Sequence, residues 1–292
     1  MKGSAVPIGI FDGVHRGHQL VLSRAVAAAR QRDLRVAVIT FDPHPVAVLR
    51  PEAMPLMLTT VPRRIELLRE HGADEVVVLE FTEALSRQSP EEFIEKTLLA
   101  RLAAERIVVG QNFRFGHRAT GDVALLRKYD LEVDDVPLLG DVETISSTYI
   151  RERVAEGDVA AAAVALGRPH FVEGPVVRGD ARGRSLGFPT ANIGVDHRIA
   201  IPRDGVYAGH VERASGKRSI AAISVGTNPT FDGVHRRVEA YIIDEGHELE
   251  LYDEHLVVSF AERLRGMEKF ASVDDLVDQM AKDVEATRAR LH

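Results

Sequence analysis

Residues 5–41 read AVPIGIFDGVHRGHQLVLSRAVAAARQRDLRVAVITF. An apolar run and a glycine-containing turn come first, then apolar residues at spacings of three and four, then the β-branched run LRVAVITF. These changes of period predict a strand, a turn, a helix and a second, buried strand. Similar β-branched runs follow at 74–81, 105–110 and 131–139. A further helix is expected over 89–104, where Ser89 and Glu92 have capping-box spacing. The first half therefore predicts an α/β fold with a parallel sheet and helices on both faces.

The sequence pattern changes after residue 150. Two short helical stretches, 147–158 and 159–168, precede a region rich in Gly, Pro and alternating apolar residues. Its alternating segments lie at 205–212, 219–226, 236–244 and 249–260. They are typical of antiparallel strands in a small barrel or sandwich. An amphipathic helix is expected to close the chain, with Ser272 as its N-cap. We expect one domain over 1–155, a helical linker over 156–168 and a second domain over 169–292.

The composition of the 292-residue chain narrows the class of protein. Its 45% hydrophobic and 28% charged residues are typical of a soluble protein with one or two domains. The absence of cysteine excludes disulfides, thiolate catalysis and Cys-based metal sites. Neither a membrane-spanning run nor a signal peptide is expected. A net charge of -7 opposes nonspecific nucleic-acid binding but leaves small phosphorylated ligands open. We expect a cytoplasmic protein that binds neither nucleic acid nor membrane.

The strongest chemical signal is the pair His15 and His18 at the expected start of the first helix. Residues three apart at a helix start project from one face. Free amides and the positive end of the helix dipole attract phosphate there, and Gly17 lets a ligand approach closely. Two imidazoles can donate hydrogen bonds to phosphoryl oxygens. The alternative is a pair of surface histidines beside a turn.

A resemblance to a known family rests on four stretches of the first half. They are GIFDGVHRGHQ (9–19), FDPHP (41–45), VGQNFRFGHRATGD (109–122) and ISSTYIRERV (145–154). They occur in the order and spacing found in prokaryotic bifunctional riboflavin kinase/FAD synthetases, which this chain resembles. The resemblance implies a Rossmann-like nucleotidylyltransferase domain that transfers AMP from ATP to FMN and releases pyrophosphate. It makes His15, His18 and Arg151 catalytic candidates and Asp12 a residue that shapes the turn or places a ligand rather than a base.

The second half adds a different phosphate chemistry. Pro189, Thr190 and Asn192 belong to the motif P-T-A-N, and the two polar side chains share a side if the segment is extended. Their oxygens suit a hard cation such as Mg²⁺. In the family this motif belongs to the riboflavin kinase β-barrel, and Glu239 matches the general base toward the 5′-hydroxyl of riboflavin. The alternatives are a glycine-rich hairpin and a solvent-facing glutamate.

The ligands that the resemblance implies are riboflavin, FMN, ATP with Mg²⁺, and the product FAD. The remaining site candidates are expected to bind them. Expected ATP-binding residues are Gly9, Phe11, Asp12, Gly13, Gly17, Ser146, Ser147, Thr148, Gly179, Arg184 and Gly187. Expected flavin-binding residues are His44, Asn112, Arg114 and Asp122, and expected metal ligands are Thr190 and Asn192.

Two features leave alternatives open. Pro7, which removes a backbone donor from the first strand, stands where many related sequences carry Ser or Thr. Pro7 is therefore the basis of one alternative hypothesis, a riboflavin kinase with impaired adenylyltransferase. The other alternative is a non-catalytic flavin- or nucleotide-binding regulator. The hexapeptide FDGVHR also returns at 231–236. There the continuation alternates as a strand, so a turn is expected at 232–233, with His235 away from the chemistry.

Overall fold

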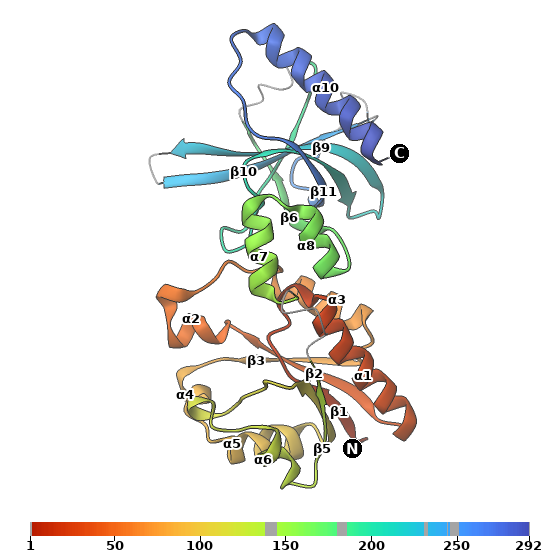
Figure 1. Ribbon diagram of the computed structural model, residues 1–292, viewed down its shortest axis with the longest axis vertical. Coiled ribbons are helices and arrows are strands. Elements are labelled where there is room, and N and C mark those ends of the chain that lie inside the picture. Colours follow the sequence, from red (N-terminus) through yellow and green to blue (C-terminus); the bar gives the residue numbers. More distant parts are fainter. Residues whose placement is uncertain are drawn as a thin grey trace. The chain divides into compact units, whose positions relative to one another are not determined.

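The computed structural model describes residues 2–137, 145–179, 186–230, 233–243, 245 and 251–291, and of 228–230 and 233–235 it describes the backbone alone. The chain divides into two compact units, Met1–Ser147 and Thr148–His292. Each unit has its own sheet, and both are drawn in Figure 1.

In the described part of the first unit, five strands form a sheet of order β3-β2-β1-β4-β5. The strands are β1 (Ser4–Pro7), β2 (Arg35–Asp42), β3 (Glu75–Glu80), β4 (Ala104–Gly110) and β5 (Glu132–Val136). All four neighbouring pairs run parallel. The predicted parallel α/β fold is therefore confirmed.

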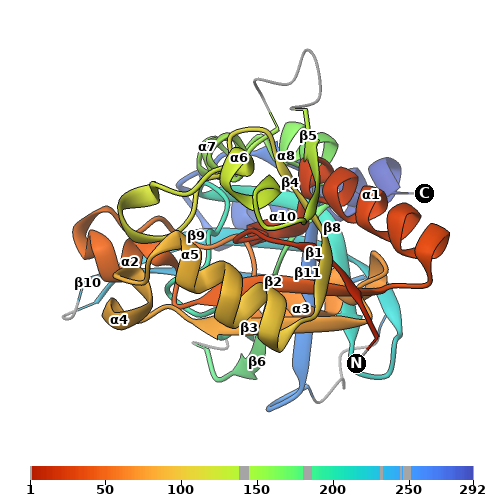
Figure 2. The same ribbon diagram turned by 90° about the horizontal axis from the view of Figure 1, so that it is seen from below.

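Helices cover both faces of this sheet (Figure 1; Figure 2). The longer ones are α1 (Arg16–Arg32), α3 (Val61–Glu70) and the π-helical segment η3 (Phe93–Arg101). Short helical pieces are η1 (Asp12–Val14), α2 (Pro45–Leu49), η2 (Pro51–Ala53), α4 (Glu83–Ser86), α5 (Pro90–Glu92), η4 (His117–Ala119) and α6 (Val123–Arg127). Ser89 and Glu92 form the predicted capping box, but the helix continues as a π-helix rather than an α-helix. Apolar side chains from η3, α6 and four of the strands meet in one buried cluster.

The central strand β1 accommodates the proline that the sequence singled out. Pro7 is its last residue and lies opposite Val108 of β4. Pairing between β1 and β2 runs through Ser4 and Ala5 and resumes beyond the proline, where Ile8 bridges Ile39. The proline therefore lies within the sheet without ending it.

The edge strand β5 carries acidic side chains. Arg106 of β4 contacts Glu132 at 3.1 Å and Asp134 at 3.8 Å. Arg127 of α6 contacts Asp135 at 3.1 Å. The predicted strand over 131–139 is thus present over Glu132–Val136, and its last two residues lie outside the described residues.

In the described part of the second unit, six antiparallel strands close a barrel of order β10-β7-β6-β11-β8-β9. The strands are β6 (His170–Val177), β7 (Ala191–Ile193), β8 (Gly205–Arg213), β9 (Arg218–Thr230), β10 (Gly233–Ile242) and β11 (His255–Arg265). Helices α7 (Ser147–Glu156) and α8 (Val159–Leu166) precede the barrel, and α10 (Val273–Leu291) packs on β8 and β9. The predicted barrel, helical stretches and C-terminal helix are confirmed. Ser272 accepts a hydrogen bond from the Asp275 amide, as expected of an N-cap.

One expected strand, 249–260, begins later than the pattern indicates. Tyr252 and Asp253 form a turn, and β11 starts only at His255. Asp253 has a φ of 64°, in the left-handed region that alternation of apolar residues does not reveal.

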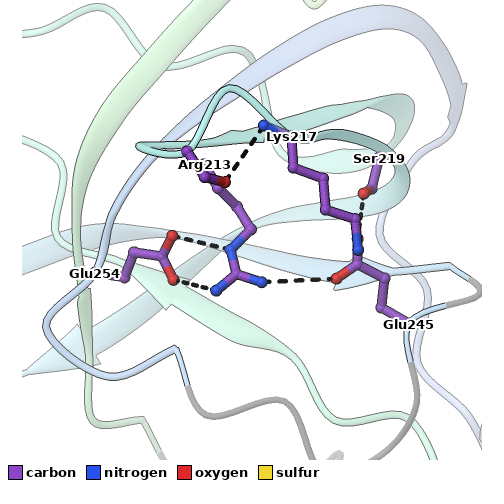
Figure 3. A network of polar contacts seen from close by, with 6 residues as sticks. Arg213, Lys217, Ser219, Glu245 and Glu254 are labelled. Carbon is purple, nitrogen blue, oxygen red and sulfur yellow. Dashed lines mark hydrogen bonds and ion pairs between the residues drawn. The ribbon is translucent and has the colours of Figure 1, made fainter.

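A network of charges ties the turn between β8 and β9 to the segments before β11 and after β10 (Figure 3). Arg213 donates to both oxygens of Glu254, at 2.9 and 2.8 Å. Glu245 accepts from Ser219 and forms an ion pair with Lys217 at 2.7 Å. Burial opposes ionisation of Glu245, but these donors outweigh it and hold the pKa of the carboxyl below its ordinary value.

Candidate active sites

A tight turn joins β1 to α1 and holds the two histidines. Phe11 has a φ of 53° and Gly13 a φ of 77°, so the chain reverses direction within η1. His15 then caps α1, its Nδ1 accepting from the His18 amide at 3.4 Å. The first-turn amides of α1 therefore lie at the carboxyl edge of the parallel sheet, where open α/β folds bind ligands.

His15 and His18 lie against each other, as their spacing predicts. Their rings stack with centroids 3.6 Å apart and planes 20° from parallel. The edge of Phe11 contacts His18 at a centroid distance of 5.1 Å. A Cβ atom at Gly17 would lie 3.2 Å from the ring of His15, so glycine leaves the pair undisturbed.

The surroundings of His18 favour its neutral form. Burial lowers the pKa of His18 well below its ordinary value of 6.5, and the nearby charges of His15 and Arg64 lower it further. The Nδ1 atom of His18 is buried without a hydrogen-bond partner among the described residues. A lowered pKa favours the neutral imidazole, which has one N–H group to donate to a ligand.

The carboxylate of Asp12 forms hydrogen bonds that fix the turn. Its side chain is 1% exposed, and its carboxylate accepts from the amides of Leu58 at 3.0 Å and Thr59 at 3.2 Å. These bonds fix the segment before α3 against η1. Ser147 at the start of α7 donates to the Asp12 carbonyl at 3.0 Å, so the predicted serine lies beside the turn. Ser146 precedes it, while Thr148 and Arg151 follow on α7 in the second unit.

Arg64 is a residue of this site that the sequence analysis missed. It is 2% exposed, and its Nη1 donates to Thr40 Oγ1 and to the Phe41 carbonyl, both at 3.2 Å. Burial lowers its pKa, against the opposing influence of Asp12 and Asp42. A signal was present in the sequence: Arg64 shares a helix face with Leu67 and Leu68, where an apolar residue is expected.

A cavity of about 900 Å³ adjoins the turn within the first unit. Gly9 and Ile10 form part of its wall, and much of the rest is aromatic: Phe41, Phe81, Phe93, Phe113 and Phe115. Phe113 and Phe115 stack with centroids 5.4 Å apart. Such a cavity suits a large planar ligand. Phe81 and Phe93 were missed by the sequence analysis, although Phe81 directly follows β3, much as Phe41 lies in the last two residues of β2.

The four predicted flavin residues have different positions. Arg114 lines the cavity and donates to Asp122 at 3.1 Å. Asp122 also caps α6, and this backbone hydrogen bond is the main reason that its pKa lies below the ordinary value. His44 caps α2 through Nδ1, and Asn112 is exposed.

The second site lies on the outer face of the barrel. Glu239 and Tyr241 of β10 alternate with buried Val238 and Ala240, so they point away from the barrel core. Thr190 donates to Glu239 at 3.1 Å. Asn192 of β7 is the register partner of Glu239, which puts both side chains on the same face of the sheet. The structure therefore brings Thr190, Asn192 and Glu239 together.

The predicted glycines of this unit have separate roles. A Cβ atom at Gly179 would overlap the Asn192 amide, at 2.3 Å from its nitrogen, so the amide fits into the space that glycine leaves. Gly187 has a φ of 83° and open space around it. Arg184 lies outside the described residues.

A cavity of about 180 Å³ separates this face of the barrel from α10. Thr190, Ser224 and Glu239 line one side, and Met280 and Asp283 of α10 line the other. Asp283 accepts two hydrogen bonds from Arg265, at 2.9 and 2.7 Å, which attaches the helix to β11. Arg265 and Asp283 were missed by the sequence analysis. Asp283 lies one helical turn from Met280 on the inner face of α10, and this position was the available signal.

Comparisons with known proteins match both halves of the chain. The family described as FAD synthetase matches residues 1–149, and the family described as riboflavin kinase matches residues 166–291. The bifunctional riboflavin kinase/FMN adenylyltransferase of Escherichia coli K12 is 34% identical over 288 residues, which cover 97% of this chain and 91% of that one. The protein of the same description from Listeria monocytogenes is 38% identical over 289 residues, with coverage of 97% and 90%.

A solved structure is similar over nearly the whole length. A protein described as a macrolide-efflux protein from Streptococcus pneumoniae has a TM-score of 0.90 and 37% identity, covering 99% of this chain and 95% of its own. Efflux is part of that protein's description. Among the residues described in the present structure, we find no helix with the length and apolar character needed to span a membrane.

Proposed function

The chain belongs to the family of bifunctional riboflavin kinase/FMN adenylyltransferases, and we propose how its residues divide the two reactions. The barrel unit transfers the γ-phosphoryl group of ATP to riboflavin, and the α/β unit transfers AMP from a second ATP to the resulting FMN. The observation that carries this division is the pairing of each phosphate-binding arrangement with a cavity inside its own unit: the histidine pair with the aromatic cavity, and Thr190 and Glu239 with the cavity under α10.

In the α/β unit, adenylylation is an attack of an FMN phosphate oxygen on the α-phosphorus of ATP. A new P–O bond forms, and the bond to pyrophosphate breaks. No protein nucleophile is required, because positioning and neutralisation of the developing charge supply most of the catalysis. His15, His18 and the first-turn amides of α1 are arranged to bind phosphoryl oxygens.

We assign the flavin ring of FMN to the aromatic cavity of this unit. Its volume of about 900 Å³ lies within the usual range of about 300–1,000 Å³ for ligand pockets. The stacked rings of Phe113 and Phe115 offer an apolar surface to the isoalloxazine ring, and Arg114 offers a positive charge at the rim.

In the barrel unit, Glu239 is the general base. A carboxylate beside the primary hydroxyl of riboflavin accepts its proton as the γ-phosphoryl group arrives. Thr190 already donates to this carboxylate at 3.1 Å, which holds Glu239 on the cavity wall. The cavity of about 180 Å³ is small for a tricyclic ring, so we propose that the flexible side chains of Met267 and Met280 move when riboflavin enters.

The residues near Glu239 fit a Mg²⁺ ion. The hydroxyl of Thr190 and the side-chain carbonyl of Asn192 are hard oxygen donors on one face of the barrel, and Gly179 leaves room around the amide. The hydroxyl of Thr190 can offer a lone pair to the cation while its O–H group donates a hydrogen bond to Glu239. When bound, Mg²⁺ would neutralise charge on the ATP phosphates. Because ATP is the donor in both reactions, we also propose a cytoplasmic location.

The product profile tests this proposal. Purified protein is incubated with riboflavin, ATP and MgCl₂, and the flavins are separated by chromatography over time. We expect FMN first and FAD later, with one pyrophosphate released for each FAD. Addition of EDTA is expected to stop phosphorylation.

Other outcomes would favour other functions. Accumulation of FMN without FAD, also when FMN is supplied directly, would indicate a kinase with an impaired adenylyltransferase. Tight flavin binding without any product would indicate a regulator and contradict the proposal.

A further inference from the structure

Arg64 occupies a junction beneath the phosphate-binding turn. Its guanidinium joins the end of β2 to this turn, because Thr40 accepts from Arg64 and donates in turn to the Ile10 carbonyl at 2.8 Å. The second acceptor, the Phe41 carbonyl, belongs to a residue that lines the aromatic cavity. One buried side chain thus connects the wall of the cavity with the loop that leads to the histidines.

A buried guanidinium is costly unless its charge has a use or a partner. Nη1 of Arg64 bonds to neutral oxygens, and its Nε has no hydrogen-bond partner among the described residues. The nearest carboxylates, Asp12 and Asp42, act on Arg64 through space. The carboxylate of Asp12 already accepts hydrogen bonds from the amides of Leu58 and Thr59, so Arg64 does not have this carboxylate to itself.

The charges that act on His18 are those of His15 at the start of α1 and Arg64 in α3. Arg64 is in turn under the influence of Asp12 in η1 and Asp42 at the end of β2. Of these, Arg64 brings a positive charge that does not depend on pH in the physiological range. A fixed charge at this depth attracts phosphate and discourages a second positive charge on His18.

We propose that Arg64 is a positioning residue for adenylyl transfer, which holds the Ile10–Asp12 turn on the end of β2 and gives the phosphate site a fixed positive charge close to His18. The inference rests on the proposed adenylyltransferase activity of this unit. Arg64 itself contacts neither the first-turn amides of α1 nor the aromatic cavity. Its effect passes through Thr40, Phe41 and His18.

The test compares Arg64→Met, Arg64→Lys and the control Arg69→Met in the full chain. Arg69 is exposed on the same helix. Formation of FAD from FMN and ATP is measured from pH 5.5 to 9, and the ring protons of His18 are titrated by NMR. Phosphorylation of riboflavin in the same samples reports whether the barrel unit is folded, and the dispersion of the NMR spectrum reports whether the α/β unit is folded.

For Arg64→Met we expect kcat for FAD formation to fall by up to about 100-fold, with a smaller change in the KM for FMN. The pKa of His18 rises when the cation is removed, so the acidic limb of the FAD profile moves to higher pH. For Arg64→Lys, which keeps the charge and loses the two-acceptor geometry, His18 titrates as in the wild type and kcat falls only a few fold. Arg69→Met behaves as the wild type in every measurement.

The proposal is overturned if Arg64→Met leaves both the FAD profile and the His18 titration unchanged. If Arg64→Met does not fold, Arg64→Lys decides: a His18 pKa that returns to its ordinary value, despite the retained charge, contradicts the electrostatic role. If the wild type makes no FAD, the proposed function fails, whereas the His18 titration still tests the role of Arg64.

Discussion

The hexapeptide FDGVHR occurs at 11–16 and again at 231–236, and the two copies fold differently. In the first copy the residues form the turn η1 and the cap of α1. In the second, Gly233–Arg236 belongs to β10, where Arg236 lies opposite Thr227 of β9. Phe231 and Asp232, on which the expected turn depends, lie outside the described residues.

The difference teaches that the continuation decides the structure and the chemistry. The first copy is followed by Gly17 and His18 and a helical period, so the turn closes onto a helix start. The second is followed by alternating residues that pair across a barrel and place Glu239 on its outer face. The same six residues therefore lead to a helix start, which we propose binds phosphate, in one unit and to the carboxylate of Glu239 in the other.

The strongest test of this comparison is Glu239→Gln. The amide keeps the shape of the side chain but cannot accept the proton of the riboflavin hydroxyl, so FMN formation is expected to fall by about 10²- to 10⁴-fold. FAD formation from supplied FMN, measured in the same preparation by chromatography, is expected to stay within about twofold of the wild type. Loss of both activities would contradict a separation of the two sites.

The reciprocal variant is His18→Ala in the first copy. Removal of the imidazole takes away a hydrogen-bond donor to the phosphoryl oxygens, and FAD formation is expected to fall by about 10²- to 10³-fold while FMN still accumulates. His235→Ala provides the matched control in the second copy, and we expect both activities to persist. A kinase defect in His235→Ala would show that the second copy also takes part in catalysis.

A smaller effect is expected for the arginines that end the two copies. Arg236 donates to Asp204 at 3.1 and 2.7 Å and to the Ile201 carbonyl at 2.8 Å, whereas Arg16 is exposed. Arg236→Ala is expected to lower the free energy of unfolding of the barrel unit by about 1–2 kcal/mol, and Arg16→Ala by less than about 0.5 kcal/mol. Chemical denaturation followed by circular dichroism measures both. Equal losses of stability in the two variants would show that the two arginines contribute equally to the folded structure.

The smallest expected effect is a pH dependence of the Arg236 contribution. Burial raises the pKa of Asp204, but hydrogen bonds from Thr227 and Arg236 outweigh it and hold the pKa below 3.8. A carboxyl with a lowered pKa in the folded state stabilises the protein above 3.8, and this contribution is lost as the pH falls through the folded value. The stability difference between wild type and Arg236→Ala is therefore expected to shrink between pH 6 and pH 3. A constant difference would show that the Asp204 charge is unimportant.

Much of the fold could be predicted because hydrophobic periodicity and helix-capping residues are local features of the sequence. Apolar and alternating runs indicated the strands of the α/β unit and β8 to β11 of the barrel, whereas β6 and β7 were not identified. Ser89 and Ser272 marked real helix starts. The histidine pair was predictable because three-residue spacing at a helix start fixes geometry by itself. The apolar pattern alone ran a strand across Asp253, since a left-handed residue other than glycine leaves no trace in that pattern.

The parts that could not be predicted depend on contacts between distant segments. Arg64 and His18 come from different helices, and their electrostatic coupling arises only when α3 packs on η1. Arg265 and Asp283 lie 18 residues apart and meet only after α10 folds back onto the barrel. A charged residue on an apolar helix face indicates burial, but the residue that it contacts depends on the tertiary fold.

The acidic edge strand β5 has a consequence for the behaviour of the protein in concentrated solution. An open sheet offers unsatisfied backbone groups to a strand of another molecule, and a closed barrel offers none. A strand that approached β5 would have to strip water from Asp134 and Asp135 and compete with Arg106 and Arg127 for them. These side chains thus oppose intermolecular strand addition at the β5 edge of the open sheet, whereas the barrel is protected by its closure alone.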